Sequence, residues 1–448
     1  MSAILDIALS GLRASQIAID TTAHNVANAS VEGYSRQRAT VATQSSQVTS
    51  KGFLGGGVVV KDAERITNRW TERHLNTELT ESGYYNELYD RLSQVEAVFN
   101  ETTTPGIADA LNNYFEAASA MADNPESVGD RTNFAQAAQQ LATRITNADT
   151  QLVNALTDTR TGADQEVVNI NQMLDEVAQL NGTIMGMVQN DRSASDMQDR
   201  RDMLLRSLSE LTGGQSYVTE DGAEASFSVN GVALVLGSSS RHLEFGGTGF
   251  TTADTGQPVT IDKGKLGALY EVVKTGGVID DYRTQLNTLA SSIITNVNTQ
   301  FTAAYGLDGL NGRPLFTGTG ASDMAVSTVM MDDPRKIAAS GDGTPGNNVG
   351  AKVYTNMRKG AYISGQSWDD YYQSIVGGIG GETLTASSQK SSLNSLVDEL
   401  KNRVDEVRGV SLDEEMANLI QFQQVYNASS RLVQTVKEMT DAVLTIGR

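Results

Sequence analysis

The sequence of 448 residues contains no cysteine, which excludes disulfide bonds, thiol catalysis and cysteine-ligated metals. Six prolines are few for this length, and their scarcity favours long, uninterrupted helices. Aromatic residues make up only 6% against 39% hydrophobic residues, so the expected cores are aliphatic and helical. No apolar run approaches the length of a transmembrane helix. A chain of this length is expected to divide into two to four domains.

Positive charge is also scarce. The chain has 34 Lys and Arg against 54 Asp and Glu, a formal charge of −20, which argues against extensive nucleic-acid binding. The first residues lack the basic region of a Sec signal, and Asp6 interrupts their apolar run. The segment up to Arg38 is neutral, whereas a helix built for an anionic membrane would be basic. We therefore expect neither a nucleic acid nor a membrane as a partner.

The residues that carry chemistry do not form a recognisable site. His24, His74 and His242 lie in three separate predicted elements, so we expect no zinc site. The acids 413–415 are adjacent on one helix and point in different directions, unlike catalytic carboxylates that converge on a pocket. The glycine-rich stretches match neither a P-loop nor a dinucleotide fingerprint. We expect no catalytic residue, no cofactor and no metal.

Both ends of the chain carry apolar residues at alternating spacings of three and four. In the first segment, from about Ser2 to Ala29, the row contains Leu5, Leu12, Ile19 and Val26. In the last segment, from about Leu412 to Ile446, the row contains Leu412, Leu419, Phe422, Tyr426, Val433, Val436 and Val443. This second row is widened by Met416, Ile420, Val425, Leu432, Met439 and Leu444. We expect two helices that pair as a coiled coil and whose rows form the assembly interface.

The middle of the chain changes its pattern twice. Helices are expected at about 64–100, 107–122, 131–159, 164–190, 195–211, 266–305 and 383–407. From Gly213 to Lys263 short alternating runs replace them, and Asn230-Gly231 predicts a type I′ hairpin. Residues 306–365 are glycine-rich and mixed.

The expected fold class is therefore mainly α with inserted β units. Terminal helices pair as an inner coiled-coil domain, a long-helix bundle comes next, and small β units lie outermost. The expected domains are an inner coiled coil (1–40 with 411–448), a helical bundle (41–212, 264–305 and 366–410), a small β insertion (213–263) and a second mixed insertion (306–365).

The stretch "TTAHNVANASVEGYSRQR", Thr21 to Arg38, leads out of the first helix. It could be a ligand site, a basic nucleic-acid arm or an assembly joint. The histidine has no partner nearby in the sequence, and two arginines are too few for an arm in so acidic a chain. We interpret it as a joint formed by Asn25, Asn28, Gly33, Tyr34 and Arg36. The arginines at 36 and 38 are expected to pair with acids on a neighbouring subunit.

The stretches "LSGLRASQIAIDTTAHNVANASVEGYSRQR" and "GVSLDEEMANLIQFQQVYNASSRLVQTVKEMTDAVLTI" resemble the two ends of flagellar axial proteins of the rod–hook family. Gly33 to Gln37 and "DRRDMLLRSLSELTGG" are similar to the hook-associated members, so the resemblance spans nearly the whole chain. The family usually has a small polar residue at the position of His24 and Thr-Pro at Val31-Glu32. The missing proline predicts a looser turn before Gly33.

This resemblance implies a non-enzymatic structural subunit that joins the flagellar hook to the filament. The subunit would be exported unfolded by the flagellar type III apparatus, without a cleaved signal, to the extracellular hook–filament junction. Its implied partners are further copies in a ring, hook protein, hook-associated protein 3 and an export chaperone that binds near the C-terminus. The candidate chaperone-binding residues are Leu419, Phe422, Val425, Tyr426 and Leu432.

Two alternatives stay open at this point. Another axial protein, such as hook-associated protein 3 or a hook or rod subunit, would share the terminal helices. The long helical block after residue 60 argues against hook and rod subunits, and the Asn-Val-Ala-Asn and Gly-Tyr-Ser motifs argue against flagellin-like members. A secreted adhesin or hydrolase on a helical stalk would need a binding or catalytic set, and the short inserts contain no catalytic set.

Overall fold

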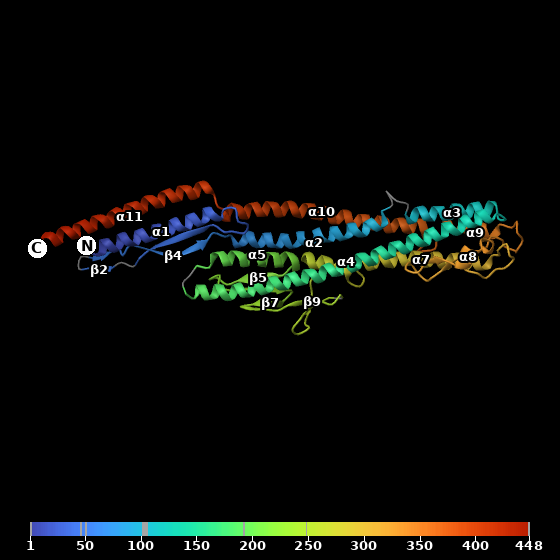
Figure 1. The fold of residues 1–448 in the computed structure, drawn as a ribbon, viewed down its shortest axis with the longest axis horizontal. Helices are drawn as coiled ribbons and strands as arrows, with labels where there is room; N and C mark the ends of the chain where they lie inside the picture. Colours follow the sequence, from blue (N-terminus) through green and yellow to red (C-terminus); the bar gives the residue numbers. More distant parts are fainter. Residues whose placement is uncertain are drawn as a thin grey trace.

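A computed structural model describes residues 2–44, 47–49, 52–100, 106–190, 193–247 and 249–446. The molecule is elongated, its main helices run along the long axis, and both chain ends lie at the same tip (Figure 1). Among the described residues, no helix is long and apolar enough to cross a membrane. The mainly helical fold class with inserted β units is confirmed.

The two terminal helices form a rod at one end of the molecule (Figure 1). Helix α1 (Ser2–Asn28) and helix α11 (Leu412–Ile446) pack side by side and antiparallel. The pairing is close at Gly11, where an added Cβ would lie 3.1 Å from the Ser429 hydroxyl. The predicted helices at both ends are confirmed, and the α11 bounds match the predicted ones.

A two-stranded ribbon covers another side of α1. Strand β1 (Gln37–Thr43) pairs antiparallel with β4 (Val58–Arg65), and β2 (Gln47–Thr49) pairs with β3 (Gly52–Leu54). The hydroxyl of Ser10 on α1 accepts a hydrogen bond from the backbone N–H of Val58 at 3.1 Å. No strand is expected here from the sequence, because the ribbon has no regular alternation of apolar and polar residues that would signal it.

The body of the molecule is a bundle of long helices. Its members are α2 (Arg69–Phe99), α3 (Ile107–Asp123), α4 (Val128–Val188), α5 (Ser195–Thr212), α6 (Gly264–Val273), α7 (Val278–Ala303) and α10 (Trp368–Arg408). The predicted break between 159 and 164 is wrong, because α4 continues through it with Thr159 and Ala163 buried against the body. The predicted start of α10 near residue 383 is also wrong. Ser367 caps a helix that runs straight through the glycines 377, 378, 380 and 381.

One large core joins these helices to residues 306–365. Those residues contribute β12 (Phe316–Thr317), β13 (Ala325–Val326), α8 (Thr328–Asp332), η1 (Pro334–Lys336), α9 (Val349–Asn356) and η2 (Met357–Lys359). Their apolar side chains, such as Leu315 and Ile337, are fully buried in the same cluster as α3, α4 and α7. The segment is therefore packed into the body in this structure.

A small β unit with its own core lies along α4 and α5 (Figure 1). Its sheets contain β5 (Gln215–Val218), β6 (Ala225–Val229), β7 (Val232–Leu236) and β8 (Ser239–Ser240), and then β9 (Leu243–Phe245), β10 (Phe250–Thr252) and β11 (Pro258–Val259). The type I′ turn between β6 and β7 is confirmed by positive φ at Asn230 (44°) and Gly231 (84°).

Candidate functional site

Asn25 is the centre of the joint between the rod and the body. It lies in the last turn of α1 with 1% of its surface exposed. Its Oδ1 accepts hydrogen bonds from the Tyr34 hydroxyl (2.8 Å) and the Gln37 N–H (2.9 Å). Its Nδ2 donates to the Gln37 carbonyl (2.9 Å) and to Glu415 Oε2 (3.0 Å). The amide therefore uses its full hydrogen-bonding capacity to hold the chain after the turn, and the start of α11, against α1.

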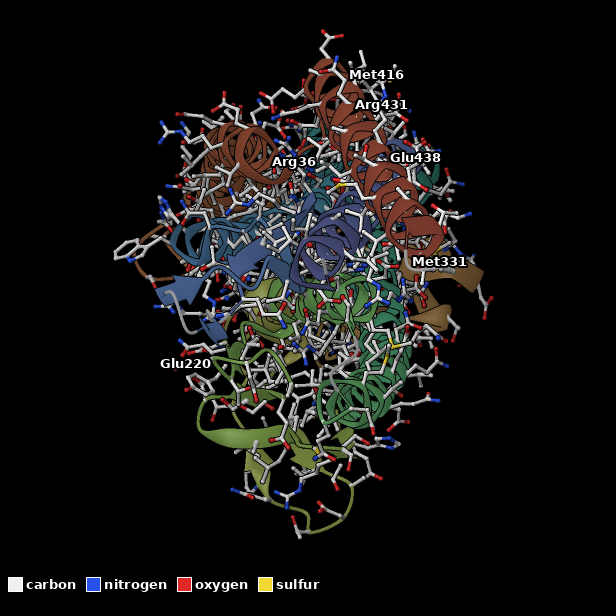
Figure 2. All side chains as sticks on the ribbon, turned by 90° about the vertical axis from the view of Figure 1, so that its left-hand side faces the viewer. Arg36, Glu220, Met331, Met416, Arg431 and Glu438 are labelled. Carbon is white, nitrogen blue, oxygen red and sulfur yellow. The ribbon has the colours of Figure 1, made fainter. Side chains whose placement is uncertain are left out.

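Arg36 ties three further elements together at this point. Its Nε and Nη2 each lie 2.7 Å from Oε1 of the buried Glu415, and its Nη1 lies 2.8 Å from Glu414. Its backbone N–H donates to the Arg408 carbonyl at the end of α10, and its carbonyl accepts from the Ile66 N–H after β4. Figure 2 shows Arg36 between α10 and α11. The expected ion pair of Arg36 with a neighbouring subunit is wrong, because both acids belong to its own chain.

The body holds the joint through three aspartates on α5. Asp199 accepts hydrogen bonds from the Ser35 N–H (3.0 Å) and from Arg65 (2.8 Å), and Arg65 also donates to Asp202 (2.8 Å). Burial raises the pKa of Asp199 above its ordinary value, and its bonds with Arg65 oppose that rise. The third aspartate, Asp196, accepts from the Gln37 side chain at 3.0 Å.

The turn itself requires a glycine. Gly33 has φ of +82°, and a Cβ at this position would overlap the Met203 sulfur on α5. Burial raises the pKa of Tyr34 well above its ordinary value, and the nearby aspartates and Glu415 add to the rise. The phenol therefore stays protonated and able to donate. Asn28 donates to the His24 carbonyl at 3.0 Å, so this hydrogen bond stays within the last turn of α1 and does not link α1 to another element.

A cavity of about 720 Å³ opens beside this turn, between the 29–34 loop and the ends of α2, α5 and α10. Its wall combines Leu75, Leu79 and Met203 with Arg206 and Arg408. Burial, and then the charge of Arg408, lower the pKa of Arg206. The cavity leaves space on one side of the turn, whereas hydrogen bonds hold the other side.

The predicted apolar residues of α1 and α11 fall into a covered group and an exposed group. Val436 is buried, and the half-buried members are Leu5, Leu12, Ile19, Val26, Leu419, Phe422, Tyr426 and Val433. On α1 the most deeply buried residues are small or polar, such as Ala8, Ser15 and Thr22. The exposed apolar residues of α11 are Leu412, Met416, Ile420, Val425, Leu432, Met439, Val443 and Leu444. Figure 2 shows Met416, Arg431 and Glu438 along the outer side of α11. One copy of α1 therefore covers only part of the α11 row.

The three histidines each lie beside a single carboxylate. His24 is 3.2 Å from Asp196, His74 is 3.4 Å from Glu78, and His242 is 2.9 Å from Asp175. Within the described part of the chain, no group of three or more metal-ligating side chains comes together.

The three α5 aspartates and the pairing role of Glu415 are absent from the sequence interpretation. The aspartates stand at spacings of three in "SDMQDRRD", which places them along one side of a helix and was an available signal. Glu415 is explained from the sequence only as an acid in the first turn of a helix. Its partner Arg36 is 379 residues away, so no local pattern relates the two.

Three family models match the chain. The model "Flagellar hook-associated protein FlgK helical domain" matches residues 92–316. The model "Flagella basal body rod protein" matches residues 5–34, and "Flagellar basal body rod FlgEFG protein C-terminal" matches residues 403–446. The two rod-family matches fall on α1 with the joint and on the end of α10 with α11.

Similar proteins agree with these matches. The chain is 26% identical to flagellar hook-associated protein 1 of Bacillus subtilis (strain 168), over 98% of this chain and 97% of that protein. It is 24% identical to the Escherichia coli (strain K12) protein of the same name, over the full length of both. The solved flagellar hook junction protein FlgK from Burkholderia pseudomallei shares the fold, with a TM-score of 0.66, 15% identity, and coverage of 74% of this chain and 99% of that chain. The chain belongs to the FlgK family of flagellar hook-associated proteins, structural junction proteins of the bacterial flagellum.

Proposed function

We propose that α1 and α11 are the elements through which copies of this chain assemble into a ring between hook and filament. The observation that carries the proposal is the incomplete cover of α11. Met416, Ile420, Leu432 and Met439 are each about half exposed in the single chain. Burial of such side chains between copies is favourable, and it needs no catalytic chemistry.

The ring would have hook protein on one side and hook-associated protein 3 on the other. The rod (residues 1–40 and 411–448) would lie innermost around the axial channel, the helical body outside it, and the β unit at 213–263 outermost. The chain would reach this extracellular site unfolded, through the flagellar type III apparatus and without a cleaved signal.

The export chaperone would bind α11 before the rod forms. Of the candidate residues, Val425 and Leu432 are exposed, whereas Leu419, Phe422 and Tyr426 are half-buried against the rest of the rod. A chaperone that used all five would have to displace α1. Chaperone binding and rod formation would therefore exclude each other, which would keep α11 from premature assembly.

The assembly role of α11 is tested by truncation after Val410. The body should stay folded, because its large core contains no α11 residue. The truncated chain should melt like the full chain but be absent from isolated hook tips, and the cells should shed filament subunits into the medium. Normal incorporation of the truncated chain would contradict the role proposed for α11.

Hydrogen exchange on the isolated chain tests the same proposal without cells. The segments Leu5–Val26 and Leu419–Val443 should exchange quickly in the monomer and slowly in assembled junctions, because only neighbouring copies complete their burial. Strong protection of both segments in the monomer would contradict a helix pair that is completed by assembly.

A further inference from the structure

One exposed side chain is not explained by the rod or by the joint. Trp70, in the first turn of α2, is 85% exposed, whereas the other tryptophan, Trp368, is 1% exposed in the body core. An indole is a large apolar surface, and its burial against a partner is strongly favourable. Tryptophan is also enriched among the residues that dominate the energy of protein interfaces.

Two arginines supply positive charge beside this indole, and His74, which lies 3.4 Å from Glu78, adds a third polar side chain. Arg69, Arg73 and His74 are exposed, and the residues at 70, 73 and 74 share one face of α2 through their spacings of three and four. In the part of the chain that the structure describes, no carboxylate lies within ion-pair distance of Arg69 or Arg73. We call these four residues the basic Trp patch. In a chain with a charge of −20, such a patch fits an acidic and apolar partner surface.

The start of α11 has the complementary properties. Leu412, Met416 and Ile420 follow one another at spacings of four and are each just over half exposed. Asp413, which is also exposed, belongs to the same first turns of the helix. A thioether beside an indole is a favourable contact, and the aspartate can pair with an arginine.

The two surfaces lie at the same position along the long axis of the molecule. The Arg36 carbonyl accepts a hydrogen bond from the Ile66 N–H, three residues before α2 begins, and the Arg36 side chain pairs with Glu414 and Glu415 in α11. Within one chain, the two surfaces belong to helices that pack against different neighbouring helices. Helix α2 packs on α10, α5 and α6, whereas α11 packs on α1 (Figure 1). A copy placed beside the first at the same position along this axis can bring them together.

We propose that the basic Trp patch of one copy docks on the Leu412–Ile420 row of the next copy. This inference rests on the ring proposed above, and it names the surfaces that meet in that ring. The contact joins two different surfaces, so each copy uses its patch on one side and its row on the other. Such a head-to-tail contact extends from copy to copy until the ring closes.

The absence of cysteine makes a direct test possible. Cells that lack the wild-type gene would carry R73C together with M416C, and isolated hook–filament complexes would be oxidised. The expected result is a ladder of dimers, trimers and larger multimers of this chain, because a head-to-tail contact links every copy to two others. The matched control R73C with L236C places the second thiol on the β unit and should give no ladder.

Variants that exchange the charges at positions 73 and 413 provide an independent test. R73D and D413R should each reduce incorporation at the hook tip at least tenfold, and the double variant should restore it. W70A should weaken association between copies by about 30-fold, the effect of truncating an interface hot spot. Y217A, which removes another largely exposed aromatic residue from strand β5 and leaves α2 unchanged, should have no effect. Thermal melts of the isolated variants establish that each one folds.

The outcomes separate this inference from the function on which it rests. Complexes that hold the double-cysteine chain but give no multimers, or a charge exchange without restoration, would overturn the docking of patch on row. Absence of the wild-type chain from hook–filament complexes would overturn the proposed ring itself.

Discussion

Replacement of Arg36 by methionine should open the joint and leave the body folded. Arg36 is the main partner of the Glu415 carboxylate, whose side chain is 2% exposed. After the substitution, the Asn25 amide would be the one side chain in the described part of the molecule that still donates to that carboxylate. A buried charge that loses its partner is strongly unfavourable. The first turn of α11 would therefore move to bring Glu415 into water.

The size of this effect follows from the burial of the pair. Removal of one partner of a buried ion pair costs about 3–5 kcal/mol. The Glu414 contact adds little, because that side chain is 63% exposed and water screens it. A cost of about 3 kcal/mol corresponds to a roughly 150-fold larger population of the open joint.

Hydrogen exchange at the joint measures this population. The N–H groups of Ser35, Arg36, Gln37 and Ile66 all donate hydrogen bonds inside the joint, so peptides covering them report its opening. Their protection should fall about 150-fold in R36M, and the body peptides should not change. The double variant R36M/E415Q removes the buried charge and should recover most of the protection. A change below threefold in R36M, or no recovery in the double variant, would refute the reasoning.

Three further outcomes are expected. G33A should open the joint by about 2–4 kcal/mol through backbone strain and overlap with Met203, and in an M203A background only the strain of about 1–2 kcal/mol should remain in joint-peptide exchange. N181A should lower the free energy of unfolding by about 3 kcal/mol in urea titrations, because the buried amide makes four hydrogen bonds that hold the β unit to α4 and α5. Burial raises the pKa of Glu210 above its ordinary value of 4.5, so the folded state holds that proton more tightly and stability falls as pH rises through this range. E210Q should remove that part of the slope of melting temperature against pH.

The rod could be predicted from the sequence because its signal is periodic and local. Apolar residues at spacings of three and four gave both terminal helices, and for α11 they also gave the correct bounds. The type I′ hairpin was equally local, since Asn230-Gly231 accepts positive φ without help from the rest of the fold. In each case the residues that decide the conformation are neighbours in the chain.

The position of the joint could be predicted from the sequence, but the hydrogen bonds and ion pairs that hold it could not. The turn at Gly33 was visible, yet the acids that hold Arg36 and Ser35 are separated from them by 164 residues or more. Only the fold brings α5 and α11 to the same turn. The predicted start of α10 was wrong for a related reason. Glycine lowers helix propensity by about 1 kcal/mol per residue, but burial of Trp368, Tyr372 and Ile375 in the core offsets that loss.

The rod and the joint use different interactions, and the difference suits a subunit that must assemble. At the joint, hydrogen bonds and ion pairs have strict geometry, so Asn25 and Glu415 fix how the end of α1 meets the start of α11. Along the rod, contact is apolar and tolerant of small shifts. Full burial of a Leu or Met side chain is worth about 1.5–3 kcal/mol, so each half-exposed residue of α11 still has about 1 kcal/mol to gain. Four such residues per copy would supply about 4 kcal/mol at each contact, which favours assembly only where several contacts form together. In the proposed assembly a single copy would thus stay separate in solution, whereas a hook tip that offers neighbours on both sides would hold it.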